Sequence, residues 1–203
     1  MDETVEALAA QHAELESLLA GLPAGQWHAA TPCEGWDVAD VVLHLTQSDE
    51  LAIASATGRF DELASQQSGA PLGGLSVDES AALMVERERA LPVADLLGRW
   101  TSTTAHLVEL LDGMDLSTRV SWVAGTLSAR TLATTRLAET WIHAGDIADA
   151  LGRELAATDR LRLIARLAWR TLPYAFGSAG LTLRGPVALR LTSPSGNAWD
   201  FLP

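Results

Sequence analysis

Apolar residues recur at helical spacing along most of this 203-residue chain, and this periodicity restricts the fold more than any other feature. The pattern covers residues 3–21, 37–57, 76–111 and 129–151. Asp37 precedes the second segment with Asp40 in the position of a capping box, and Gly152 ends the last segment. A break is expected near Leu91–Pro92, because proline removes a helical hydrogen bond.

The remaining segments connect or extend these helices. Residues 58–75 are rich in Gly, Ser and Gln and are expected to form a loop, as are residues 112–125. A fifth helix is expected from Asp159 to about Pro173 or shortly beyond. The tail alternates in PVALRLT, turns at SPSGN and pairs back through AWDFL as a hairpin. The sequence therefore predicts an all-α four-helix bundle with a short C-terminal β-hairpin.

Composition narrows the range of partners. The chain carries 26 acidic and 14 basic residues, a net charge of −12, so its surface would repel a nucleic acid backbone. Every basic residue is arginine, which excludes lysine chemistry. Cys33 is the single cysteine, the N-terminus lacks a signal-peptide pattern, and no apolar run approaches the roughly 20 residues of a membrane span. We therefore expect a cytoplasmic protein with no membrane partner.

The segment RLAETWIHAGDIADALG, residues 136–152, contains the first candidate site. Glu139 and His143 lie four positions apart, so both project from one face of a helix and can chelate one ion. Such pairs are common in helices. Without a third ligand, a salt bridge or hydrogen bond between Glu139 and His143 is the simpler interpretation.

A third ligand comes from the segment 37–57. His44 lies at the margin of an apolar stripe that includes Val41 and Leu45, where a lone histidine is usually a core residue. Together with an inward Glu139 and His143, it completes a set of two histidines and one carboxylate. Three protein ligands leave a coordination position for water or substrate, as in catalytic zinc sites.

Two longer stretches resemble a known family. ATPCEGWDVADVVLHL is similar to the N-terminal signature of the mycothiol-dependent maleylpyruvate isomerase family, T-P-C-x-G-W followed by a helix ending in H-L. LSARTLATTRLAETWIHAGDIADALG resembles the second signature, especially that of a subgroup described only as metal-binding proteins. The resemblance implies the DinB-like four-helix fold. It also implies that His44, Glu139 and His143 bind a divalent metal, which is zinc in the isomerases.

The resemblance extends over about residues 1–180, which we expect to form the DinB-like metal-binding bundle. The isomerases continue into a sizeable C-terminal α/β domain that contributes to their active site. Here residues 181–203 would be a short β appendage or the truncated start of such a domain. A different substrate in a more open site, or a truncated chain, would explain this difference.

Several other side chains near the expected site have two interpretations each. Arg136 can hold a substrate carboxylate, although an ion pair to Glu139 or to a neighbouring helix is favoured. Asp146 can orient the His143 imidazole or pair with an arginine. Cys33 precedes a helix that would lower the pKa of its thiol, yet we expect a buried structural residue.

The remaining aromatic and imidazole side chains are assigned more simply. Trp36 is expected to hold its loop on the bundle, and Trp122 and Trp141 to line the pocket mouth or fill the core. Three other histidines show no identifiable partner in the sequence and are treated as structural: His12, His28 and His106.

These features favour an enzyme in which the metal binds a low-molecular-weight thiol and lowers its pKa. The resemblance suggests mycothiol as that thiol. The reaction would be isomerisation or S-transfer on a small electrophilic substrate, with Arg136 and Asp146 as candidate catalytic residues. Two alternatives stay open: a metal-dependent hydrolase with Asp146 or Asp49 as the base, and a non-catalytic module that binds metal or a small ligand. A homodimer is compatible with the sequence.

Overall fold

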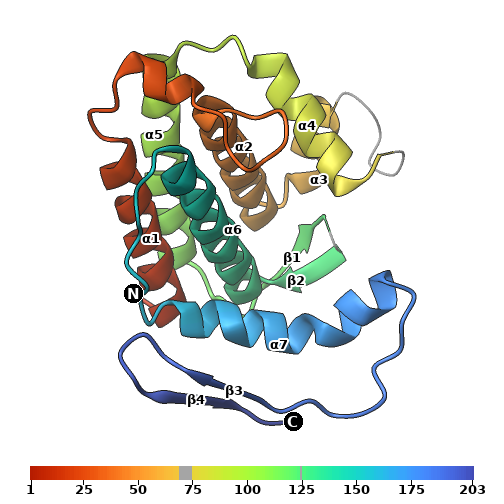
Figure 1. The fold of residues 1–203 in the computed structure, drawn as a ribbon. Helices are drawn as coiled ribbons and strands as arrows, with labels where there is room; N and C mark the ends of the chain where they lie inside the picture. The colour runs from red at the N-terminus through yellow and green to blue at the C-terminus, as the bar shows by residue number, and fades with distance from the viewer. Residues whose placement is uncertain (69–74, 124) are drawn as a thin grey trace. The chain divides into compact units, whose positions relative to one another are not determined.

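The computed structural model describes residues 1–68, 75–123 and 125–203, and most of them are helical (Figure 1). The chain divides into two compact units, Met1–Glu154 and Leu155–Pro203. The first contains α1 (Glu3–Leu19), the 3-10 helix η1 (Ala24–His28), α2 (Val38–Ala56), α3 (Phe60–Ser68), α4 (Val77–Glu88), α5 (Val93–Asp112), β1 (Arg119–Trp122), β2 (Gly125–Ser128) and α6 (Ala129–Ala150). The second contains α7 (Leu161–Ser178), β3 (Leu189–Thr192) and β4 (Ala198–Phe201).

Four long helices form the bundle that the sequence predicted. α1 packs against α5 and α6, and α2 packs against the same two helices, so that α1 and α2 lie diagonally (Figure 1). Their inward stripes meet in a core of large buried side chains: Leu8, Leu15, Leu45, Trp100, Leu107, Leu132 and Leu137. The all-α prediction is confirmed, and α2 and α6 stand side by side to carry a shared site.

Local sequence signals explain where these helices start and end. Asp37 accepts a hydrogen bond from the Asp40 backbone N–H and Asp40 reciprocates, so the expected capping box of α2 is present. Ser76 caps α4 and Ser128 caps α6, each by accepting a backbone N–H with its side chain. The expected break at Leu91–Pro92 separates α4 from α5.

The predicted loop over residues 58–75 is wrong for its first part, because Phe60–Ser68 forms α3. Phe60 and Ala64, one turn apart, bury their side chains against Leu51 and Met84. Two apolar anchors among polar residues are enough to seat a short helix on a neighbour, but they are too few for a visible periodicity. Residues 69–74 of the expected loop lie outside the described residues.

The predicted loop over residues 112–125 is also wrong in its second half. Arg119–Trp122 pairs antiparallel with Gly125–Ser128, and the ring of Trp122 lies 5.6 Å from that of Phe60. The Ser55 hydroxyl on α2 donates to the Ser121 carbonyl of β1. Contacts with α2 and α3 therefore stabilise this hairpin. Its strands are too short to give a recognisable alternating pattern in the sequence.

The second unit groups α7 with the C-terminal hairpin that the sequence predicted. The Trp169 indole donates to the Val187 carbonyl at 2.7 Å, and its ring centroid lies 6.0 Å from that of Phe201. This second compact unit begins at Leu155, before α7. Among the described helices, none is long and apolar enough to cross a membrane.

Candidate metal centre

The centre begins on one face of α6. Glu139 and His143 are one helical turn apart, and the Nε2 atom of His143 lies 3.7 Å from the Oε2 atom of Glu139. No Pro interrupts the helix here, so the i and i+4 side chains project in the same direction. The structure therefore gives this pair the chelating geometry that the spacing predicted.

His44 reaches the same point from α2. Its Nε2 atom lies 3.8 Å from the Oε2 atom of Glu139, and its ring meets that of His143 edge-on at a centroid distance of 5.1 Å. Donor atoms of all three residues lie within 4.8 Å of one another. Both imidazoles are 14% exposed and the Glu139 side chain is 42% exposed, so the cluster opens to solvent at the carboxylate.

The spacing of these donors is compatible with a bound metal ion. Nitrogen and oxygen ligands on a tetrahedral zinc stand about 3.3 Å apart, given bond lengths near 2.0–2.1 Å. The separations of 3.7 and 3.8 Å exceed a good hydrogen bond but come close to that value. The donor set of two imidazoles and a carboxylate suits zinc and similar divalent ions.

Electrostatics favour the protonation states that a metal requires. Burial lowers the pKa of His44 below its ordinary value, even though Glu139 acts in the opposite direction, so the imidazole is neutral at pH 7. The pKa of Glu139 falls to about 2, chiefly because His44 lies beside it and also because Arg136 is near. A neutral imidazole and an ionised carboxylate can bind a cation without first releasing a proton.

Similarity to known proteins agrees with this architecture. The profile of the mycothiol maleylpyruvate isomerase N-terminal domain matches residues 8–148, which include all three donors.

The chain belongs to this family.

Two uncharacterized proteins, from two strains of Mycobacterium tuberculosis, are each 38% identical to it over 199 residues, covering 97% of this chain and 75% of theirs. Crystal structures of the mycothiol-dependent maleylpyruvate isomerase and of a mutant of it superpose with TM-scores of 0.67 and 0.66. Each is 18% identical to this chain, and the match covers 97% of this chain and 78% of the other. At that identity, the likeness shows a shared fold.

In this member of the isomerase family, Asp146 and Cys33 lie behind the His143 ring. The Nδ1 atom of His143 is 2.9 Å from the Asp146 Oδ2 atom, which fixes the ring so that Nε2 faces Glu139. The Cys33 thiol donates to the same carboxylate oxygen at 3.3 Å and lies 3.7 Å from Nδ1. Of the two interpretations of Asp146, the structure favours the one in which its carboxylate orients the His143 imidazole.

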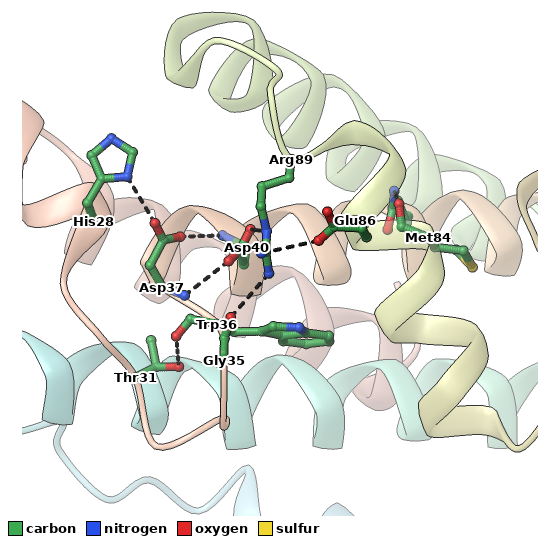
Figure 2. Close-up of polar contacts among 10 residues, drawn as sticks. His28, Thr31, Gly35, Trp36, Asp37, Asp40, Met84, Glu86 and Arg89 are labelled. Atoms are coloured by element: carbon green, nitrogen blue, oxygen red, sulfur yellow. Dashed lines mark hydrogen bonds and ion pairs between the residues drawn. The ribbon is translucent and has the colours of Figure 1, made fainter.

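The loop that carries TPCEGW, residues 31–36, is held on the bundle by backbone and side-chain contacts (Figure 2). The Thr31 hydroxyl donates to the Trp36 carbonyl at 2.9 Å, and Gly35 adopts a positive φ of 79° that closes the turn. Arg89, the residue after α4, donates to the Gly35 carbonyl at 3.1 Å and to Asp40 at 3.0 Å (Figure 2). Trp36 does hold its loop on the bundle, because its ring lies 5.1 Å from that of His44.

Cys33 is expected to be inert as a nucleophile. Burial, followed by the hydrogen bond and charge of Asp146, raises the pKa of its thiol to about 11, opposite to the lowering that a helix N-terminus would produce. Iodoacetamide should therefore alkylate Cys33 slowly at neutral pH, with a rate that rises until the pH passes about 11. Mass spectrometry of the intact protein follows this rate.

The matched variants Cys33→Ala and Cys33→Ser should keep any thiol-dependent activity within a few-fold of the parent. A loss of about a thousand-fold with the metal retained would show that the sulfur takes part in the reaction.

Arg136 does not face the centre's open side. Its side chain is 2% exposed, and its Nε atom donates at 2.7 Å to the Oδ1 atom of Asp49, which is fully buried on α2. His12 of α1 completes this group, with its Nε2 atom 3.4 Å from the Asp49 Oδ2 atom. The favoured interpretation of Arg136 as one half of an ion pair to a neighbouring helix agrees with this geometry.

Other histidines left without partners in the sequence also acquire neighbours. His28 contacts Asp37 at 2.9 Å. His106 lines a surface cavity of about 430 Å³ between α2, α3 and α5, together with Glu50 and Arg59. The metal-centre residues are not among those that line this cavity. Trp122 packs on Phe60, while Trp141 is 39% exposed on α6.

Sequence reasoning missed the contacts of Cys33 and the identity of the buried residues that pair with Arg136, Asp49 and His12. The Cys33 thiol and the Asp146 carboxylate are 113 residues apart, and no spacing rule joins them. His12 stands in the apolar stripe of α1, and an acidic residue in the stripe of α2, Asp49, was the available signal for a buried pair.

Proposed function

We propose that this protein is a divalent-metal enzyme, with zinc as the favoured ion, that uses a low-molecular-weight thiol to isomerise or S-modify a small electrophilic substrate. The observation that carries the proposal is the convergence of His44, Glu139 and His143 in a half-open cluster. Family membership supports mycothiol as the thiol, since the mycothiol-dependent maleylpyruvate isomerase shares the fold.

The three donors define what the chain contributes. His44 and His143 would hold the ion through neutral Nε2 atoms, and Glu139 would supply one negative charge from the solvent side. A bound zinc ion would supply Lewis acidity and lower the pKa of a thiol placed beside it. Asp146 holds the His143 ring in place, and His44 followed by Arg136 lowers the pKa of Glu139, so that its carboxylate is ionised.

The proposed chemistry consumes no oxidant or reductant. The thiol loses its proton, its sulfur forms a bond to the electrophilic carbon, and the electron pair of the substrate's double bond moves to the adjacent group. Rotation about the resulting single bond and expulsion of the thiolate return an isomer and regenerate the thiol. When the substrate carries a leaving group, that group departs instead and the sulfur adduct is the product.

The hydrolase alternative has less support from this geometry. Asp49 is fully buried in its ion pair with Arg136, and Asp146 is engaged by His143 and Cys33 on the side away from Glu139. Neither carboxylate is placed to activate a water molecule at the open side of the cluster. A simple binding module remains the outcome if the thiol does not engage the metal.

Cobalt substitution tests the proposal directly. We expect a thiol added at millimolar concentration and about pH 8 to produce intense sulfur-to-metal absorption in the near ultraviolet, at one thiol per cobalt. The band should disappear in His143→Ala. It should persist in Cys33→Ala, the control that excludes the protein's own sulfur as its source. A cobalt spectrum unchanged by thiol would overturn the thiol-dependent proposal in favour of hydrolysis or simple binding.

A further inference from the structure

Charge is distributed very unevenly between the two units. Residues 155–203 contain six arginines and two aspartates, a formal net charge of +4. Residues 1–154 contain eight arginines and 24 acidic residues, a net charge of −16. The two units therefore carry net charges of opposite sign, and the first unit of one copy would attract the second unit of another copy.

The positive charge of the second unit is concentrated on one stripe of α7. Arg162, Arg166 and Arg170 follow one another at i, i+4 and i+8, so they share a face of the helix, and all three are exposed. Within the described residues none of them forms an ion pair, in contrast to Arg190, which pairs with Asp200 at 3.3 Å. Tyr174, 65% exposed, provides apolar surface on the same helix.

The matching negative surface lies on α1. The first 58 residues contain ten acidic side chains and no arginine or lysine. Five of these acids pair with basic groups elsewhere in the bundle unit: Asp2, Asp37, Asp40, Asp49 and Glu50. Glu3, Glu6 and Glu16 of α1 are exposed and have no cationic partner among the described residues.

We infer that the arginine stripe of α7 in one chain docks on the exposed glutamates Glu6 and Glu16 of α1 in a second copy. The dimensions agree, since Arg162 to Arg170 rises about 12 Å along its helix and Glu6 to Glu16 about 15 Å at 1.5 Å per residue. Two such contacts related by a twofold axis would form a closed homodimer, in which no copy of either surface is left to bind a third chain. Surface ion pairs are individually weak, so several act together with apolar contacts such as that of Tyr174.

An anionic membrane or a nucleic acid would repel the bundle unit, which carries a net charge of −16. A second copy also carries a net charge of −12, so its attraction is confined to the exposed glutamates of its α1. Unlike a polyanion, it has an arginine stripe of its own, so two reciprocal contacts can form. This inference is independent of the metal centre and of the proposed reaction.

Sedimentation velocity of the full chain tests the inference. We expect a species of twice the 21.5 kDa chain mass at low salt, with a dissociation constant that rises as NaCl screens the contact. Arg162→Glu combined with Arg166→Glu should raise that constant by about tenfold or more. Arg59→Glu combined with Arg119→Glu, which changes the net charge equally on the other unit, should leave it within about threefold.

Charge reversal identifies the partner surface. Glu6→Arg with Glu16→Arg should weaken the dimer when introduced alone and restore it when combined with the two α7 substitutions. Circular dichroism confirms that each variant folds. A monomer at every salt concentration would overturn the inference. So would a dimer that is indifferent to the α7 changes, or tight binding to anionic vesicles without self-association.

Discussion

Replacing His44 with alanine is expected to remove most of the bound metal while the helical content stays unchanged. The substitution deletes one of three donors and should lower metal affinity by more than about 100-fold, beyond the loss typical of an outer-sphere partner. The bundle core is mostly apolar and is not expected to need an ion to fold, and the His44 imidazole is partly exposed at the core's margin. Metal content by elemental analysis and circular dichroism measure the two effects.

His106→Ala is the matched control, because His106 is an exposed histidine on α5 away from the three donors. It should bind metal as the parent does. Stoichiometric metal in His44→Ala would show that the ion is held by a different set, of which Cys33, His143 and Asp146 are the nearest alternative.

Replacing Arg136 with methionine should destabilise the bundle by about 3–5 kcal/mol, because it leaves the fully buried Asp49 carboxylate without its cation. Burial raises the pKa of Asp49, but Arg136 and then His12 outweigh this and hold it below the ordinary value. The lowered pKa means that the ionised carboxylate contributes stability above the unfolded-state pKa of about 3.9. That contribution is lost as the pH falls through the lower, folded-state value. Urea denaturation at neutral pH measures the effect.

Two further variants separate charge from packing. Asp49→Leu with Arg136→Met should recover much of the lost stability, since an apolar pair can replace a buried ion pair. Arg59→Met, an exposed arginine, should change stability by less than about 0.5 kcal/mol. If Arg136→Met unfolded at the same urea concentration as the parent, the ion pair would not be a stabilising contact.

Helical periodicity and capping signals were sufficient to predict the bundle and to place the three metal-donor candidates. α2 and α6 are long, so their apolar stripes fixed which residues point inward, and His44, Glu139 and His143 followed from that. α3 and the β1–β2 hairpin were not predictable in the same way. Their stability comes from contacts with Leu51, Met84 and Ser55, which belong to other segments.

The surroundings of the centre depended on contacts that sequence spacing does not encode. The partner of Arg136 could have been Glu139, one turn away, but the guanidinium pairs with Asp49, which is 87 positions distant. The same limit applies to Cys33. Its place before α2 suggested a lowered pKa, whereas the loop folds it against Asp146 and raises the pKa of its thiol.

The loop that precedes α2 has a consequence for the evolution of such chains. Its shape depends on Gly35, on the bond between Thr31 and Trp36 and on the reach of Arg89, all of which are independent of any ion. Selection for folding alone would therefore preserve T-P-C-x-G-W in a descendant that had lost its chemistry. Of the three donors, Glu139 is half-exposed and makes none of these loop contacts, so it would change first. Genomic surveys that aim to separate active from inactive homologues should score His44, Glu139 and His143, with most weight on Glu139, and disregard the signature loop.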